Sequence, residues 1–124
     1  MKIVSTLNAP QAIGSYSQAM VVNGMVYTSG QIALTPAGEM LENDVELQAH
    51  QVLKNLSNVL EASGSSLDKV IKTTIFLADM DDFLKINAIY AEYFGEHKPS
   101  RSTVAVKTLP KNALIEIDCI ALVN

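Results

Sequence analysis

Two short runs of β-favouring residues flank the dipeptide Asn23-Gly24, and this feature constrains the fold more than any other local pattern. Asn-Gly tolerates the positive φ angles that a type I′ turn requires, and such a turn joins neighbouring antiparallel strands. Residues 19–28 are therefore predicted to form a β-hairpin. Its second strand runs into Ser29-Gly30-Gln31, where the glycine allows another group to approach the backbone closely.

A helical pattern follows the hairpin. Asn43 or Asp44 can cap a helix that runs to about Ala62, and Ser63-Gly64 is a typical helix end. The apolar residues recur with the three-and-four spacing of one buried face. They are Val45, Ala49, Val52, Leu53, Leu56, Val59 and Leu60.

The rest of the chain alternates between β-branched runs and one more helical pattern. A second helix is predicted to open at Asp79 or Asp81 and to end at Gly95. Strands are predicted over 70–77, 102–107 and 114–123, with a further short strand allowed near Ile3. The order predicts a single α/β (α+β) domain spanning 1–124. We expect a mixed sheet of about six strands with both helices on one face.

Composition narrows the possible partners. Hydrophobic residues make up 48% of the chain and charged residues 18%. Average globular domains have roughly 45–50% apolar residues, glycine included, and roughly 25% charged residues. A partner subunit is therefore expected to cover apolar surface. The net charge of −4, without a basic cluster, argues against nucleic acid or an anionic membrane as partners.

Cysteine and histidine are scarce. Cys119 is the only cysteine, which excludes an internal disulfide, and it is expected to be a small core residue. His50 and His97 are too far apart to build a histidine-rich metal site, and both are expected to face solvent. Because no signal pattern or membrane-length apolar run is present, we expect a cytoplasmic protein.

Arg101 is the only arginine among nine basic residues. A guanidinium binds a carboxylate through two parallel hydrogen bonds, which an ammonium group cannot match. Arg101 lies where the chain enters a predicted strand after the rigid loop around Pro99. Residue type and position leave two interpretations about equally open: a substrate anchor, or a surface ion pair with one of the 13 acidic residues.

Four more residues are candidates. Glu116 interrupts an otherwise apolar strand, and a partly desolvated carboxylate can shuttle protons. Taken alone, the residue favours the simpler interpretation of a glutamate that faces water beside Asp118. Asn87 lies on or beside the apolar face of the second helix, where its amide would bind a ligand or the backbone. Tyr16, in a loop of glycine and serine, could cover a pocket or fill the core. Ser29 has no base beside it in the sequence, so a nucleophilic serine is not supported.

Several segments, taken together and in order, resemble the RidA family, also called YjgF, of reactive intermediate (imine) deaminases. Their spacing is close to that of the family, and they cover essentially the whole chain. The segments are Asn8–Ala19, Val26–Ile32, Val70–Phe76, Pro99–Val104 and Leu109–Lys111 together with Ile115–Ile117.

This resemblance implies a chorismate-mutase-like fold that assembles as a homotrimer with three clefts between subunits. It implies hydrolysis of 2-imino acids, the tautomers of enamines such as 2-aminoacrylate and 2-aminocrotonate, to 2-keto acids and ammonia. Neither a metal nor a cofactor is needed for that reaction. The family's site residues carry over onto Tyr16, Ser29, Gly30, Asn87, Arg101 and Glu116.

One position departs from the family. Many members have a cysteine where this chain has Thr103, so a thiol cannot be essential here. Threonine keeps a polar group of similar size at this place in the substrate site, but it forms different hydrogen bonds.

Two alternatives to a deaminase stay open. The first is a non-catalytic regulatory protein that binds a keto acid in the same cleft through Arg101. The second is a ribonuclease, a label also attached to relatives, which the acidic pI of about 5.0 and the single arginine disfavour.

Overall fold

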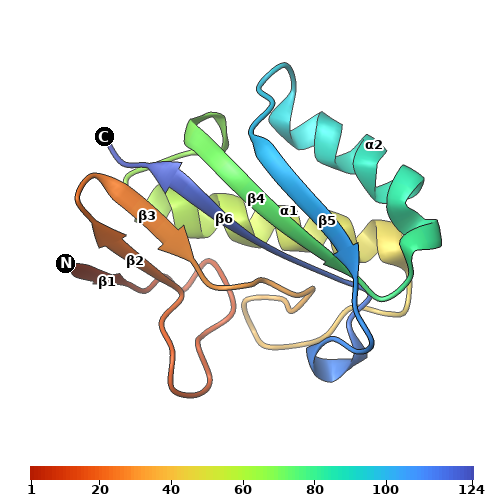
Figure 1. Ribbon diagram of the computed structural model, residues 1–124. Coiled ribbons are helices and arrows are strands. Elements are labelled where there is room, and N and C mark those ends of the chain that lie inside the picture. The colour runs from red at the N-terminus through yellow and green to blue at the C-terminus, as the bar shows by residue number, and fades with distance from the viewer.

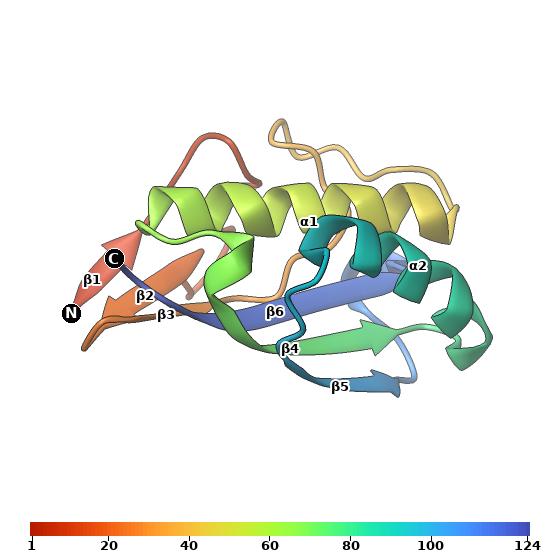
Figure 2. The same ribbon diagram turned by 90° about the horizontal axis from the view of Figure 1, so that it is seen from above.

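The computed structural model describes residues 1–124 and contains one six-stranded sheet. The strands are β1 (Lys2–Val4), β2 (Ala19–Val22), β3 (Met25–Thr28), β4 (Val70–Leu77), β5 (Ser100–Ala105) and β6 (Ile115–Leu122). The helices α1 (Val45–Ala62) and α2 (Phe83–Phe94) both lie on one face of the sheet (Figures 1 and 2). Short 3-10 turns cover Leu67–Lys69, Met80–Asp82 and Pro110–Asn112. The predicted mixed sheet with two helices on one face is confirmed.

The strand order is β1-β2-β3-β6-β4-β5, and only the β4–β5 pair is parallel. Asn23 and Gly24 have φ angles of 51° and 74°, so the predicted hairpin turn is confirmed. β5 begins at Ser100, two residues before the predicted start, because Ser100 already pairs with Lys72 of β4. Arg101 consequently lies inside a strand rather than in the loop before it.

The core lies between the sheet and α1. All seven residues of the predicted apolar face of α1 are buried, and Asp44 caps the helix by accepting hydrogen bonds from the first-turn amides. α2 begins later than predicted, at Phe83. The reason is that Asp79 accepts a hydrogen bond from the Asp81 amide (2.8 Å) and caps a separate 3-10 turn before the helix.

Two amide side chains on α1, absent from the predicted core, hold loops against the helix. Asn55 donates to the carbonyl oxygens of Ile32 (3.3 Å) and Leu34 (2.9 Å), in the segment after β3. Gln48 accepts a hydrogen bond from the backbone amide of Leu114 (2.9 Å), just before β6. Both amides are at most 2% exposed, so these loops are positioned by buried hydrogen bonds that would be costly to leave unmade.

The expectation that both histidines face solvent is wrong. His97 is half-buried, with Nε2 2.6 Å from the Val70 carbonyl oxygen, and His50 Nδ1 lies 3.0 Å from the Tyr93 hydroxyl. His50 lies where α1 meets α2, and His97 lies where the end of α2 meets β4. Cys119 is buried, as predicted, and this burial raises the pKa of its thiol to about 12.

The face of the sheet opposite the helices carries apolar side chains that nothing in the chain covers. We call it the open face; Tyr27, Val104 and Leu122 on it are 45%, 45% and 49% exposed. Alternation along β6 places Ile120 there as well. Neither helix has the length and apolar character required to span a membrane.

Gln18 anchors the loop that precedes β2, and its replacement is expected to destabilise the protein. Its side chain accepts a hydrogen bond from the Thr6 amide (2.6 Å) and donates to the carbonyl oxygens of Thr6 (3.1 Å) and Pro10 (2.7 Å), while only 3% exposed. Gln18→Leu leaves these groups unpaired, so we expect a loss of about 2–4 kcal/mol in the free energy of unfolding, measured with urea. The exposed Gln11→Leu should cost less than about 0.5 kcal/mol, and equal losses would contradict the prediction.

Candidate functional site

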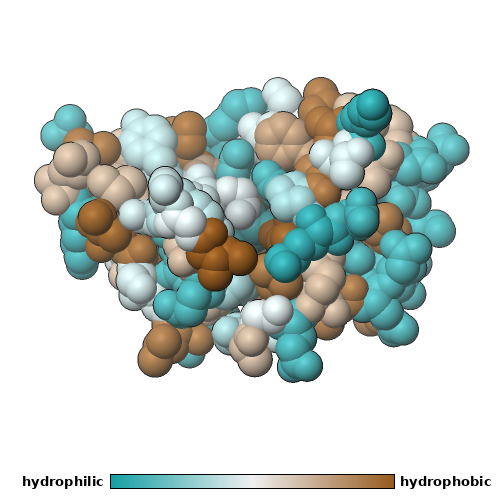
Figure 3. Space-filling model, turned by 90° about the horizontal axis from the view of Figure 1, so that it is seen from below, coloured by the Kyte–Doolittle hydropathy of each residue, from teal (hydrophilic) through white to brown (hydrophobic).

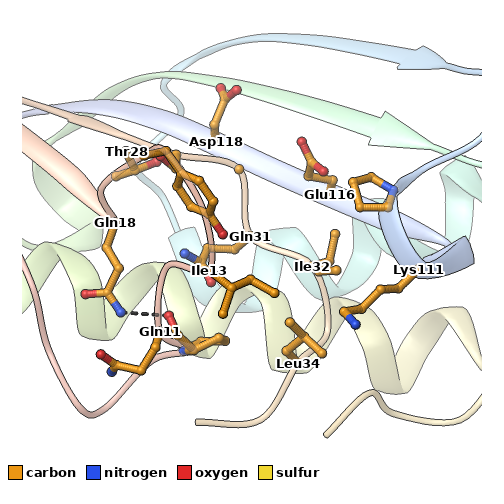
Figure 4. A pocket seen from close by; sticks show the side chains of 15 residues that line it. Gln11, Ile13, Gln18, Thr28, Gln31, Ile32, Leu34, Lys111, Glu116 and Asp118 are labelled. Carbon is orange, nitrogen blue, oxygen red and sulfur yellow. Dashed lines mark hydrogen bonds between the residues drawn. The ribbon is translucent and has the colours of Figure 1, made fainter. Parts of the chain in front are cut away.

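Four of the predicted site residues line one cleft of about 510 Å³, where the loops gather at one end of the sheet. We call it the Glu116 cleft. The four residues are Tyr16, Ser29, Gly30 and Glu116. Its wall also includes Ile13, Ile32, Leu34, Lys111 and Asp118 (Figure 4). Figure 3 views this end of the molecule, where hydrophobic and hydrophilic side chains are interspersed.

Glu116 lies against Gly30 because the segment after β3 is bonded to β6. Gln31 and Ile117 exchange two backbone hydrogen bonds of 2.9 and 3.1 Å, which brings Gly30 beside Glu116. A Cβ atom on Gly30 would lie 2.7 Å from Cδ of Glu116, closer than real Cβ contacts allow. The glycine therefore leaves room for the carboxyl group, and the prediction of close approach at Gly30 is explained by this contact.

The carboxyl group of Glu116 is half-buried and forms no hydrogen bond within the chain. Burial is the main cause that raises the pKa of Glu116, and the nearby charge of Asp118 raises it further. A carboxyl group with a raised pKa can exchange protons closer to neutral pH than an exposed one. The proton-exchange interpretation of Glu116 thus has a physical basis in its surroundings.

Ser29 holds the loop that carries Tyr16. Its hydroxyl donates to the Ser17 carbonyl oxygen (2.6 Å), and its amide donates to the Gln18 carbonyl oxygen (2.9 Å). Tyr16 is 53% exposed at the edge of the cleft, so of its two interpretations the structure favours the pocket cover over the core residue.

Arg101 lies in a different pocket, which we call the Arg101 pocket, between β5 and α2. Its guanidinium donates to the Asn87 side-chain oxygen (2.8 Å) and lies over the rings of Phe83 (5.5 Å) and Tyr90 (4.8 Å). No carboxylate is among these partners, so the ion-pair interpretation of Arg101 is wrong within the chain. The Asn87 side chain satisfies its oxygen through this hydrogen bond rather than through the backbone, and it thereby orients the arginine.

Thr103 lies two residues after Arg101 on the same side of β5. Its hydroxyl oxygen is buried and has no hydrogen-bond partner. A buried polar group without a partner is uncommon in folded proteins, so Thr103 departs from the usual pairing of buried polar atoms.

The sheet keeps Arg101 and Glu116 on opposite faces. Thr73 of β4 pairs with Arg101 on one side and with Cys119 on the other, so all three share the helix-covered face. Glu116 is three residues from Cys119 on β6 and therefore points to the open face. Arg101 and Glu116, which the family resemblance places in one site, are consequently not brought together within one chain, because strand alternation separates the two side chains.

Three residues at the cleft were not singled out from the sequence. Gln31 is 6% exposed and supplies the backbone bonds that place Gly30. Lys111 lies in the cleft wall at a φ angle of 55°, a left-handed conformation that is uncommon for a residue other than glycine. Asp118 shares its strand face with Glu116, because the two residues are two apart on β6. This spacing was the only sequence signal that could have placed Asp118 at the cleft.

The fold and the cleft define a class of small α+β protein with one mixed sheet and a cavity sized for a small molecule. The family model described as endoribonuclease L-PSP matches residues 6–123. Rat 2-iminobutanoate/2-iminopropanoate deaminase is 45% identical over 122 residues, which cover 98% of this chain and 89% of that protein.

Two further comparisons also match the whole chain. A Lactococcus lactis protein, the candidate regulator AldR, is 52% identical over 125 residues, covering 100% of this chain and 99% of that protein. The crystal structure of E. coli TdcF with bound serine superposes with a TM-score of 0.94 at 42% identity, covering 100% of both chains. The chain belongs to the RidA family, also called YjgF.

Gly30→Ala is expected to lower the imine hydrolysis proposed below without unfolding the protein. The added methyl group must displace the Glu116 carboxyl group, which is the mobile end of a side chain, and a misplacement of about 1 Å can cost about 10²-fold in rate. We expect kcat/KM to fall by about that factor, with little change in the urea midpoint. The double variant Gly30→Ala/Glu116→Gln should lose no more than Glu116→Gln alone; additive losses would show that Gly30 does not act through Glu116.

Proposed function

We propose that this protein hydrolyses 2-imino acids, the tautomers of enamines such as 2-aminoacrylate and 2-aminocrotonate, to 2-keto acids and ammonia. The observation that carries the proposal is the Glu116 carboxyl group, held half-buried and unpaired against Gly30 in a cleft of small-molecule size. The similarity to a rat deaminase of this name supports the same reaction.

In this proposal, Arg101 binds the substrate carboxylate. Its fork is oriented by the hydrogen bond to Asn87 and by the two aromatic rings, so less rotamer freedom is lost when the substrate binds. Thr103 lies on the same side of β5 as Arg101, and we propose that it lines the same carboxylate site. Fixing the carboxylate also aligns C2 of the substrate for attack by water.

Glu116 handles the protons. It accepts a proton from the attacking water as the water oxygen bonds to C2 of the protonated imine, and a carbinolamine forms. Glu116 then returns the proton to the nitrogen. It takes up the proton of the carbinolamine hydroxyl as the C–N bond breaks and the C=O bond forms, and this proton finally passes to the released ammonia, which leaves as ammonium. The Gly30 backbone helps to place the water, Ser29 holds the adjacent loop, and Tyr16 covers the cleft.

The complete site requires a second copy of the chain. Because Arg101 and Glu116 lie on opposite faces of one sheet, the Arg101 edge of one copy must meet the Glu116 cleft of another. Repetition of one such head-to-tail contact closes a ring, and we propose a homotrimer in which each copy contributes one domain, residues 1–124. The apolar open face and the unpaired edge of β5 are surfaces that such a ring would cover.

Mixed oligomers test this arrangement directly. Arg101→Ala and Glu116→Gln subunits are each expected to be inactive alone. After unfolding and refolding together in equal amounts, about a quarter of the sites should combine an intact arginine with an intact glutamate, and activity should return. Continued inactivity of properly assembled mixed oligomers would contradict a shared site.

A coupled assay tests the reaction itself. A pyridoxal-phosphate dehydratase acting on threonine supplies 2-aminocrotonate, and semicarbazide serves as a competing trap for the imine. We expect the protein to accelerate 2-ketobutyrate formation and to lower the yield of the semicarbazide adduct. Equal rates with and without the protein would remove the proposal.

The similarity to the candidate regulator AldR favours one other function, in which the same site only binds a keto acid. The two functions are separated by Glu116→Gln. If Glu116→Gln loses turnover but still binds 2-ketobutyrate, the deaminase is supported. If the natural protein shows no turnover and Arg101→Ala abolishes its 2-ketobutyrate binding, the regulator is supported.

A further inference from the structure

A second carboxylate, Asp118, lies beside Glu116 on the open face. The two residues are two positions apart on β6, so their side chains point to the same side of the strand. Both line the Glu116 cleft. Figure 4 shows both carboxyl groups directed to the same side of the strand. Asp118, like Glu116, is half-buried and has no hydrogen-bond partner within the chain. Residues two apart on a strand are separated by about 6.5–7 Å, close enough for two partly buried charges to interact.

Within one chain, few other charged or titratable groups face this pair; in the proposed ring, Arg101 of the neighbouring copy also meets the Glu116 cleft. Lys72 of β4 is on the same face, and it donates a hydrogen bond to the Ser102 hydroxyl (3.1 Å). Thr74 of β4 pairs with Ser102 on one side and with Asp118 on the other. The hydrogen bond to Ser102 therefore holds the Lys72 ammonium group beside the row of side chains that contains Asp118. The other titratable groups around the cleft are Lys111 in the β5–β6 loop, Tyr16 in the loop before β2, and Tyr27 on β3.

The charges act on the two carboxyl groups in opposite ways. The charge of Asp118 adds to burial in raising the pKa of Glu116. Burial raises the pKa of Asp118 as well, but the positive charge of Lys72 opposes that rise. The pKa of each group is therefore raised, but the positive charge of Lys72 favours the ionised form of Asp118. We expect Asp118 to lose its proton first and Glu116 to titrate beside its charge.

We propose that Asp118 is a positioning residue for the reaction: its charge, maintained by Lys72, sets the pH range over which the Glu116 carboxyl group gains and loses its proton. Asp118 does not touch the reacting atoms and acts only through Glu116. The role of Asp118 in the reaction rests on the proposed function. Its effect on the titration of Glu116 is a property of the folded protein and can be measured without any turnover.

The experiment follows the Glu116 carboxyl group by nuclear magnetic resonance during a pH titration of ¹³C-labelled protein. In Asp118→Asn, the midpoint of the Glu116 titration should move to lower pH, because the neighbouring negative charge is gone. Asp118→Glu keeps the charge and should keep the midpoint near that of the natural protein. Glu61→Gln makes the same change in net charge from the exposed side of α1 and should not move it.

Two further measurements test the proposal, and the first keeps it falsifiable if Asp118→Asn folds poorly. Lys72→Met should move the Asp118 midpoint to higher pH. Salt at about 1 M, where the screening length is only about 3 Å, should shrink the difference between the natural protein and Asp118→Asn. An unchanged Glu116 midpoint in folded Asp118→Asn, or an equal shift in Glu61→Gln, would overturn the proposal. So would an unchanged Asp118 midpoint in Lys72→Met.

The outcome also separates this inference from the proposed function. If the protein deaminates imines, the acid limb of the kcat/KM profile should move with the Glu116 midpoint in Asp118→Asn. A shifted resonance midpoint in a protein without imine hydrolysis would support the Asp118 assignment and remove the deaminase. A shifted acid limb with an unchanged resonance midpoint would overturn the Asp118 assignment alone.

Discussion

Arg101→Ala should lower kcat/KM for 2-imino acids by about 10²–10³-fold. Removing one partner of a desolvated, hydrogen-bonded charge pair costs about 2–5 kcal/mol, and each 1.4 kcal/mol corresponds to about tenfold. Arg101→Lys keeps the charge but loses the planar fork that Asn87 orients (2.8 Å), so we expect most of the loss to persist. The coupled 2-ketobutyrate assay gives the rates, and calorimetry gives the affinity for 2-ketobutyrate.

Lys98 provides the matched control for Arg101. It lines the same pocket but is exposed, so Lys98→Gln should change kcat/KM by no more than about twofold. If Arg101→Lys were as active as the natural protein, a point charge would be sufficient, and the two-bond recognition of the carboxylate would be refuted.

Glu116→Gln should lower kcat by about 10²–10⁴-fold, the usual contribution of a positioned acid or base. Glutamine has nearly the same shape as glutamate but cannot accept the proton of the attacking water at neutral pH. Because Arg101 supplies the binding of the carboxylate, the affinity for 2-ketobutyrate should change little. Single-turnover and steady-state rates, measured beside the exposed control Glu92→Gln, check this expectation.

The same variant makes a prediction about stability. The folded state raises the pKa of Glu116, mainly through burial, so the folded protein holds its proton to higher pH than the unfolded chain does. The stabilising effect is fully present below the unfolded pKa and is lost as pH rises through the folded pKa. Glu116→Gln should therefore be at least as stable as the natural protein at pH 7, and its stability should fall less with pH above about 4. A clear loss of stability at pH 7 would show that the ionised carboxylate has a structural partner.

Much of the fold follows from local patterns. Asn23-Gly24 predicted the turn, the three-and-four spacing predicted the buried face of α1, and the β-branched run predicted β4 with its observed bounds, 70–77. These signals are short-range, because backbone preference and the burial period of one element are set by residues close in the sequence. The boundary of β5 was missed because its first residue is in a strand only through pairing with β4.

Arg101 and Glu116 were predictable as chemical groups, but their relation was not. Arg101 stood out because it is the only arginine, and Glu116 stood out because it interrupts an apolar strand. Their placement on opposite faces depends on the order β6-β4-β5 and on the register that aligns Arg101 with Cys119 through Thr73. Strand order and register are set by long-range packing, which no local window of sequence contains.

By itself, then, the sequence determined the elements of this protein, the helix face that is buried, and the residue types available for binding a carboxylate and moving a proton. Only the tertiary structure placed Glu116 against Gly30, through the Gln31–Ile117 bridge, and gave Arg101 an amide partner in Asn87. It also showed that Arg101 and Glu116 lie on opposite faces of the sheet within one chain. The physical reason is that a sheet separates alternate side chains to opposite faces, so groups on different strands meet only where pairing and packing bring them together.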